Sequence, residues 1–259
     1  MNKTGEYIKG KNKLLSIYFT AEYPVKGCTK EIILSLQKEG VDLIEVGIPF
    51  SDPIADGPVI QKSSEIALAN GFNLNQLFID LEEIQSKLHI PIVLMGYFNT
   101  MLAFGIELFL KQCNKLGIDT LILPDFPPEV YEKSYLTLFQ NYHVSPVFLV
   151  TPQSSEARIN YLNTLSNAFI YIVSDNSITG SVQGFSENQL NYFERINKRN
   201  FDVPVLIGFG ISDKASYLKA SEYSNGVIIG TAFIKSLTKS EKLNDSIQNF
   251  IKTFKISEV

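Results

Sequence analysis

Two carboxylates, Glu45 and Asp56, are the side chains of this 259-residue chain with the clearest potential for chemistry. Glu45 lies within an apolar segment, Leu43–Gly47, that has the character of a buried strand. Burying a carboxylate is costly unless it is paired or kept neutral. Asp56 follows eleven residues later, in a loop stiffened by Pro49, Pro53, Gly57 and Pro58. One carboxylate on a rigid strand and one on a stiffened loop are a common arrangement for acid–base catalysis near neutral pH.

A structural role for the same two carboxylates is the alternative. Glu45 would then form an ion pair in the core, and Asp56 would cap the following helix. That helix is predicted to begin at Pro58, which suits a first helical position, and to end at Asn70-Gly71. The spacing alone leaves both interpretations open, since structural ion pairs occupy similar positions.

The elements that must position these side chains alternate along the chain. Short apolar runs are separated by segments of helical periodicity, which predicts parallel strands joined by crossover helices. The predicted strands are Leu15–Thr20, Leu43–Gly47, Ile92–Met95, Thr120–Leu123, Val144–Val150, Phe169–Val173, Val203–Gly208 and Gly226–Ile229. Helix boundaries are predicted at Thr29, Gly40, Pro91 and Gly117, at a Ser186/Gln189 capping box, and around a closing helix from Leu243 to Phe254.

Eight strand–helix units in about 250 residues predict a single (β/α)8 barrel domain covering residues 1–259. The competing doubly wound sheet usually has fewer strands and a glycine-rich turn after its first strand, which Ala21-Glu22-Tyr23-Pro24 does not provide. Chemistry in such barrels gathers on the loops that follow the strands. We therefore expect Glu45, Asp56 and Tyr171 to meet at one mouth of the barrel.

Three glycine-containing clusters follow the last three predicted strands: Ile178-Thr179-Gly180, Gly208 to Ser212, and Gly230-Thr231-Ala232. Glycine lets backbone N–H groups approach an anion closely, and the positive end of a helix adds to the attraction. Many barrels build a phosphate site from their last two strands and a short extra helix. The clusters favour phosphate binding over plain turns.

Composition excludes several classes of protein. The chain is 45% hydrophobic and 19% charged, as in globular proteins, and its formal charge of −4 indicates no nucleic-acid partner. Its apolar runs are too short to span a membrane, and residues 1–13 lack the apolar core of a secretory signal. Cys28 and Cys113 are predicted to be reduced cysteines of a cytosolic protein. Two histidines, His89 and His143, are predicted to lie away from the site, so no metal is expected.

The segment from Glu45 to Pro58 resembles the signature of the tryptophan synthase alpha subunit family. The resemblance continues in order over nearly the whole chain, at Tyr18–Pro24, Pro91–Asn99, Pro124–Pro128, Tyr171–Gly180, Gly208–Ser212 and Gly226–Thr231. It implies a lyase that cleaves indole-3-glycerol phosphate to indole and glyceraldehyde 3-phosphate by a retro-aldol step. Glu45 would be the acid, Asp56 would bind the ring N–H, and Tyr171 would orient Glu45 or the substrate.

The resemblance also implies the rest of the site. Apolar and aromatic side chains would hold the indole ring (Tyr18, Met95 and Ile122), and the glycine clusters would hold the phosphate (Thr179, Gly180, Gly210, Gly230 and Thr231). It implies no metal or organic cofactor in this subunit. The expected partner is a pyridoxal-phosphate β subunit in an α2β2 heterotetramer, with Asp125 at the interface.

The chain departs from the family pattern at several positions. Glu22 and Thr120 stand where glycine is common, and Thr100 stands where proline is common. Asp175 replaces an arginine of the loop after the sixth strand, and Ser177 replaces a glycine there, which puts the closure of that loop in doubt. Two other functions stay open: an isomerase acting on a sugar phosphate, and an allosteric binding module for a β subunit.

Overall fold

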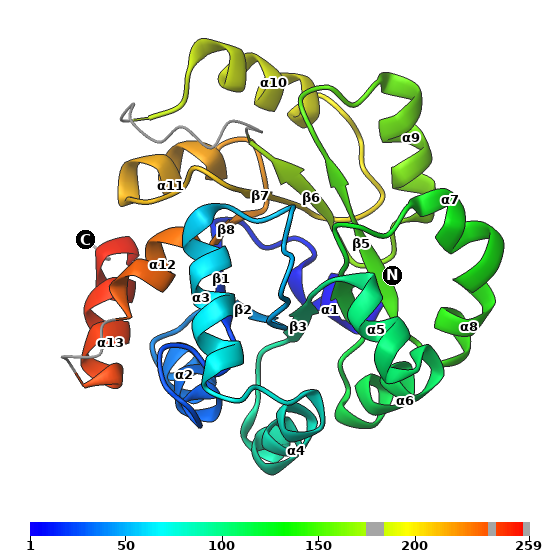
Figure 1. Cartoon of the computed structure of the whole chain (residues 1–259). Coiled ribbons are helices and arrows are strands. Elements are labelled where there is room, and N and C mark those ends of the chain that lie inside the picture. The colour runs from blue at the N-terminus through cyan, green and yellow to red at the C-terminus, as the bar shows by residue number, and fades with distance from the viewer. Residues whose placement is uncertain (175–183, 238–241, 256–259) are drawn as a thin grey trace.

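Eight parallel strands close into a barrel in a computed structural model that describes residues 1–174, 184–237 and 242–255 (Figure 1). The strands are hydrogen-bonded in sequence order, and β1 pairs with β8 to complete the circle. They are β1 (Leu14–Thr20), β2 (Leu43–Gly47), β3 (Ile92–Met95), β4 (Thr120–Ile122), β5 (Ser145–Val150), β6 (Ile170–Val173), β7 (Val205–Gly208) and β8 (Gly226–Ile229). The predicted (β/α)8 fold is confirmed.

The predicted strands differ from the observed ones only at their ends. The ranges predicted for β2, β3 and β8 are those observed. The seventh strand begins at Val205 rather than at the predicted Val203, because Pro204 has no N–H to donate to the ladder. The fourth strand ends at Ile122, two residues before Pro124.

Helices form a ring around the barrel (Figure 1). They are α2 (Thr29–Lys38), α3 (Pro58–Ala69), α4 (Leu74–Ile84), α5 (Phe98–Phe104), α6 (Ile106–Leu116), α7 (Pro128–Val130), α8 (Leu136–Asn141), α9 (Glu156–Leu165), α10 (Glu187–Asn197), α11 (Lys214–Ser221), α12 (Thr231–Ser236) and α13 (Leu243–Phe254). A 3-10 helix, Gln85–Lys87, follows α4, and a short π-helix, Tyr131–Tyr135, follows α7. No helix in the described part of the chain has the length and apolar character needed to cross a membrane.

Several predicted helix boundaries are confirmed. Ser186 and Gln189 form the expected capping box at the start of α10. Gly117 ends α6 in the left-handed conformation, with φ +73°. Pro58 begins α3, but the prediction that Asp56 caps this helix is wrong. The N-cap residue is Gly57, and no side chain caps α3, because the Asp56 carboxyl is turned toward Tyr97 instead.

Several helices were not predicted, among them the one nearest the N-terminus. Helix α1 (Lys3–Ile8) forms within the polar N-terminal segment and lies across the centre of the barrel in Figure 1. The Thr4 backbone and hydroxyl both donate to Asp119, just before β4, and Asn2 donates to the Thr120 hydroxyl. Ile8 is fully buried among the side chains that fill the barrel. This helix therefore covers the end of the barrel where the strands begin.

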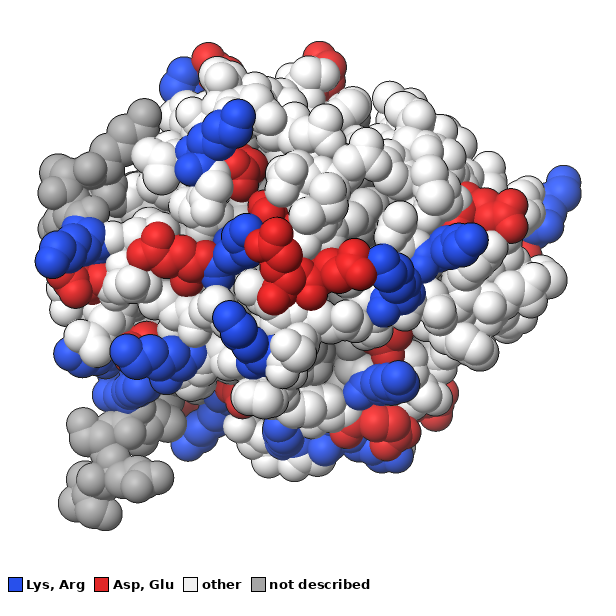
Figure 2. Space-filling view, turned by 90° about the horizontal axis from the view of Figure 1, so that it is seen from below, with Lys and Arg blue, Asp and Glu red and all other residues white. Residues whose placement is uncertain are grey.

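The core has two layers. One fills the barrel itself, with side chains such as Leu43, Val93 and Leu206, and the other packs the strands against the helices. Cys28 and Cys113 are free and buried in the outer layer. Figure 2 shows basic and acidic side chains interspersed over the face that it presents.

Candidate active site

Glu45 points into the barrel from β2 and is completely buried. Its neighbours across the strands are Tyr18 on β1 and Val93 on β3. The Ser16 hydroxyl donates a hydrogen bond to Oε1 over 2.8 Å, and Oε2 has no hydrogen-bond partner among the described residues. Burial raises the pKa of Glu45 to about 8, against a smaller lowering by the Ser16 bond. Glu45 is thus mainly protonated at neutral pH. The alternative in which Glu45 forms a structural ion pair in the core therefore does not describe this carboxyl.

Asp56 lies half-buried in the loop that follows β2. Its Oδ2 accepts a hydrogen bond from the Tyr97 hydroxyl over 3.2 Å, and the same hydroxyl accepts one from the Ala55 N–H over 2.9 Å. Phe50 stacks on the Tyr97 ring with centroids 4.9 Å apart. Burial raises the pKa of Asp56 to about 6, partly offset by the Tyr97 bond. Asp56 is therefore mainly ionised at neutral pH.

Two buried tyrosines, Tyr18 on β1 and Tyr171 on β6, lie beside the carboxyls. Burial raises the pKa of each phenol well above its ordinary value, and the charges of Glu45 and Asp56 both add to the rise. Both phenols therefore keep their protons. The structure thus brings together the carboxyls and tyrosines that are separated in the sequence.

Glycine makes room for both rings. A Cβ atom at Gly47 would overlap the Tyr18 hydroxyl, and one at Gly208 would overlap the Tyr171 hydroxyl. The absence of a side chain at these two strand ends therefore leaves space inside the barrel for the tyrosine rings. The Tyr171 ring also meets Phe209 edge to face, with centroids 6.0 Å apart.

The predicted ring-binding side chains Met95 and Ile122 end β3 and β4 and belong to the cluster that fills the barrel. Ile122 is fully buried and Met95 is partly exposed. Tyr171 belongs to the same cluster.

The predicted phosphate-binding glycines follow β7 and β8. Gly210 adopts φ +70°, and a Cβ there would stand 3.4 Å from the Ser174 hydroxyl oxygen. This hydroxyl donates to the Phe209 carbonyl over 2.6 Å, and Phe209 itself has φ +66°. Gly230 precedes Thr231, the exposed first residue of α12. The predicted Thr179 and Gly180 lie outside the described residues, as do Asp175 and Ser177.

The sequence analysis missed three hydrogen-bonding partners: Ser16 for Glu45, Tyr97 for Asp56, and Ser174 for the loop after β7. Each acts through a contact with a residue from another strand or loop. The only sequence signal was a polar or aromatic residue within or directly after an apolar strand. His89 and His143 are exposed and precede β3 and β5, at the opposite end of the barrel.

The sequence profile of the family described as "Tryptophan synthase alpha chain" matches residues 6–258. The chain belongs to this family. It is 48% identical to the tryptophan synthase alpha chain of Christiangramia forsetii over 255 residues, which cover 98% of this chain and 99% of that one. It is 49% identical to that of Flavobacterium johnsoniae over 251 residues, 97% and 98% of the two chains.

Solved structures of the family have the same fold. The tryptophan synthase subunit alpha of Legionella pneumophila superposes with a TM-score of 0.87 at 28% identity, over 98% of this chain and 97% of that one. A chain of the tryptophan synthase complex of Pyrococcus furiosus superposes with a TM-score of 0.84 at 29% identity, over 94% and 98% of the two chains.

Family membership confirms the activity that the resemblance implied. As a tryptophan synthase alpha chain, the protein is a lyase that cleaves indole-3-glycerol phosphate to indole and glyceraldehyde 3-phosphate in tryptophan biosynthesis. The two alternatives, a sugar-phosphate isomerase and a binding module without catalysis, are therefore set aside.

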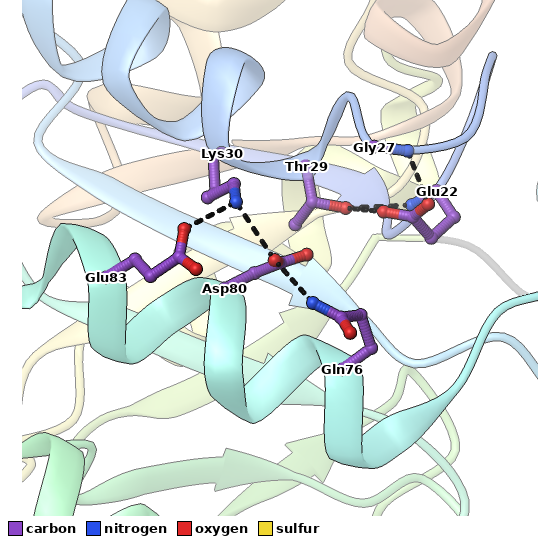
Figure 3. A network of polar contacts seen from close by, with 7 residues as sticks. All are labelled: Glu22, Gly27, Thr29, Lys30, Gln76, Asp80 and Glu83. Carbon is purple, nitrogen blue, oxygen red and sulfur yellow. Dashed lines mark hydrogen bonds and ion pairs between the residues drawn. The ribbon is translucent and has the colours of Figure 1, made fainter.

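Two departures from the family pattern have a structural explanation. Glu22 adopts φ +62°, a conformation that favours glycine. Its carboxylate compensates by accepting bonds from the Gly27 N–H and the Thr29 hydroxyl (Figure 3). Thr120, where the resemblance leads us to expect glycine, bonds to Asn2 and Asp119 beneath α1.

Thr100, a third departure from the family pattern, and Asp125, the residue expected at the interface, also have defined surroundings. The Thr100 hydroxyl is buried without a partner among the described residues, and nothing in the structure explains it. Asp125 is exposed and accepts a hydrogen bond from the Phe98 N–H at the start of α5.

Proposed function

We propose that Glu45 is the general acid and base of indole-3-glycerol phosphate cleavage. The observation that carries this proposal is a fully buried carboxyl with a pKa near 8, one oxygen of which, Oε2, has no partner within residues 1–174, 184–237 and 242–255. A protonated Glu45 donates its proton to the ring carbon that bears the glycerol chain. The resulting carboxylate then takes the proton of the neighbouring hydroxyl. The oxygen lone pair forms the aldehyde, and the carbon–carbon bond breaks to restore the aromatic ring.

Asp56 is proposed to stabilise the positive charge that develops on the ring nitrogen. Its carboxylate would accept a hydrogen bond from the ring N–H, which strengthens as the ring becomes cationic. A pKa near 6 keeps Asp56 charged at neutral pH, while Glu45 holds its proton. The Tyr97 hydroxyl holds Asp56 in place, and Tyr171 is proposed to orient Glu45 or the substrate.

The rest of the substrate is proposed to bind to the predicted residues. The ring would pack between Tyr18 on β1, Met95 at the end of β3 and Ile122 at the end of β4. The phosphate would take hydrogen bonds from the backbone of Gly210, Gly230 and Thr231, together with Thr179 and Gly180. The left-handed backbone at Gly210 supports this assignment, because such a conformation lets successive backbone N–H groups converge on an anion.

A β subunit is the proposed partner, in an α2β2 assembly, and pyridoxal phosphate is assigned to that subunit alone. Chains of the Pyrococcus furiosus and Mycobacterium tuberculosis tryptophan synthases are among the structural neighbours. The loop that holds Asp56 also carries Ile54, whose side chain is 88% exposed. An exposed apolar side chain next to the catalytic carboxyl supports docking at this face, with Asp125 nearby on the loop after β4. We place the assembly in the cytoplasm.

Replacing Glu45 by Gln tests the central assignment. The amide keeps the shape of the protonated carboxyl but has no proton to transfer, so indole release should fall by roughly 10²–10⁴ while the substrate still binds. The matched control is Glu39→Gln, a buried carboxylate at the end of α2 that bonds to Gln248. Near-normal indole release by Glu45→Gln would reject Glu45 as the acid.

A further inference from the structure

Ser16 is a polar residue inside the barrel that the reaction described above does not use. It lies on β1 between the inward-facing Leu14 and Tyr18, opposite Leu43 of β2, and is completely buried. A hydroxyl in such surroundings costs free energy unless it is hydrogen-bonded. Among the described residues its bonding partner is Glu45, over 2.8 Å.

We propose that Ser16 is a positioning residue that fixes Oε1 of Glu45 and thereby selects Oε2 as the oxygen that carries the catalytic proton. The proposal rests on the assignment of Glu45 as the acid.

The hydrogen-bond pattern supports this choice of oxygen. Ser16 donates to Oε1, which must therefore present a lone pair and not a proton in the neutral acid. If Oε1 carried the proton and donated it to Ser16, the Ser16 hydroxyl hydrogen would need another acceptor. No other acceptor for it is found among the described residues. The proton of the neutral acid therefore resides on Oε2, which has no partner in the described part of the chain and is free for the substrate.

The same bond acts on the second half of the reaction. When Glu45 has given its proton to the ring, Oε1 carries negative charge and the Ser16 bond becomes charge-assisted. The other polar groups near Glu45 are the protonated Tyr18 on β1 and Tyr171 on β6, and Asp56 in the loop after β2. None of these is cationic, and β3 contributes the apolar Val93. Ser16 is therefore the described donor that stabilises the Glu45 carboxylate.

Ser16→Ala tests the proposal in the full chain. Loss of a hydrogen bond to a charged group should lower kcat by about 10- to 100-fold and leave KM for indole-3-glycerol phosphate nearly unchanged. Because Ser16 stabilises the ionised form, its loss should also raise the pKa of Glu45. The basic limb of the pH profile of kcat/KM should then move upward by roughly one unit. Ser16→Cys, which keeps a weak donor, should fall between the parent and Ser16→Ala.

Ser145→Ala is the matched control, since Ser145 is a buried serine at the start of β5 that bonds to Asn167. It should leave kcat and the basic limb unchanged. If Ser16→Ala matches this control in both measurements, Ser16 is a core residue only and the proposal is wrong. If Ser16→Ala does not fold, the proposal is judged on Ser16→Cys, whose unchanged kcat and basic limb would overturn it.

Experiments can distinguish a failure of the Ser16 proposal from a failure of the assignment of Glu45 as the acid. In the Glu45→Gln background, Ser16→Ala should cause no further loss, because the bond it removes acts only through the acid. An active Glu45→Gln enzyme would reject the acid itself. An inactive Glu45→Gln enzyme with an unaffected Ser16→Ala enzyme would reject only the role of Ser16.

Discussion

Burial raises the pKa of both Glu45 and Asp56, yet at neutral pH Glu45 is mainly protonated and uncharged whereas Asp56 is mainly ionised. Glu45 is sealed inside the barrel and has one donor, so its pKa rises to about 8. Asp56 lies half-buried in a loop, and its pKa rises only to about 6. A proton donor and a charged acceptor can thus coexist in one site near pH 7.

The pH dependence of kcat/KM should follow from these two groups. Activity requires Asp56 ionised and Glu45 protonated, so the profile should be bell-shaped with limbs near pH 6 and pH 8. Indole release measured from pH 5 to pH 9.5 at low substrate checks this. In Asp56→Asn the acidic limb should disappear from whatever activity is left. A profile that is flat from pH 5 to pH 9 would show that neither carboxyl titrates as described.

Stability should depend on pH through Glu45. The unfolded chain releases this proton near pH 4.5, whereas the folded protein holds it to about pH 8. The folded-state pKa is raised, so the free energy of unfolding falls as the pH rises through this window, by on the order of 5 kcal/mol. Urea unfolding of the parent and of Glu45→Gln at pH 5 and pH 8 measures it. The Gln variant should lose less stability than the parent, and an equal loss in both would contradict the prediction.

At the scale of single residues, Glu45 could be predicted from the sequence, whereas the hydrogen-bond partners of Glu45 and Asp56 could not. A carboxylate within an apolar strand is visible in one segment of the chain. The hydrogen bonds from Ser16 and from Tyr97 depend on the register of β1 against β2 and on the end of β3. The alternative in which Asp56 caps α3 is wrong for the same reason, because a distant tyrosine binds this carboxyl instead.

Among the elements, the buried strands were predictable because each is a short apolar run covered on both sides. Helix α1 was not, since its segment has little apolar periodicity. Its position depends on contacts of Asn2 and Thr4 with Asp119 and Thr120, which lie more than 100 residues away. The loops after β7 and β8 were recognised from glycine, but the bond from Ser174 that fixes the first of them was not.

Gly210→Val tests the loop after β7. A side chain at Gly210 would meet the Ser174 hydroxyl and strain a backbone at φ +70°, so the phosphate should bind more weakly and KM should rise at least tenfold. Gly117→Val is the control, because Gly117 has a similar φ of +73° but ends α6 with open space around it. Binding of glycerol phosphate by calorimetry checks the result. Equal binding by Gly210→Val and the parent would place the phosphate elsewhere.

At the scale of the whole molecule, closure of the barrel brings residues that are far apart in the sequence together at one end. Pairing of β1 with β8 brings Tyr18 next to Gly230, and β2 presents Glu45 between β1 and β3. Helix α13 packs beside α2, so two helices far apart in the sequence lie side by side on the outside of the barrel (Figure 1). We infer from this closure that residues 1–259 form one domain, with chemistry confined to one end of it.

The active end of this domain is also the end at which a β subunit is proposed to dock, which couples assembly to catalysis. In the free chain the described anchor of the Asp56 carboxyl is the Tyr97 hydroxyl. A partner that orders the loop with Ile54 and Asp56 would hold the carboxylate in its productive position more of the time. Direct transfer would also keep indole, which is small and apolar, from diffusing away.

Adding a β subunit should therefore raise indole-3-glycerol phosphate cleavage by roughly 5- to 150-fold, the usual range of coupling between sites. Asp56→Ala should abolish both the basal activity and this response, because the same carboxylate serves both. Asp202→Ala is the control, since Asp202 is an exposed carboxylate just before β7, at the other end of the barrel. It should behave like the parent in titrations of cleavage rate against β subunit. A free chain that is already fully active and indifferent to the β subunit would instead be an independent lyase, with the Asp56 loop ordered by Tyr97 alone.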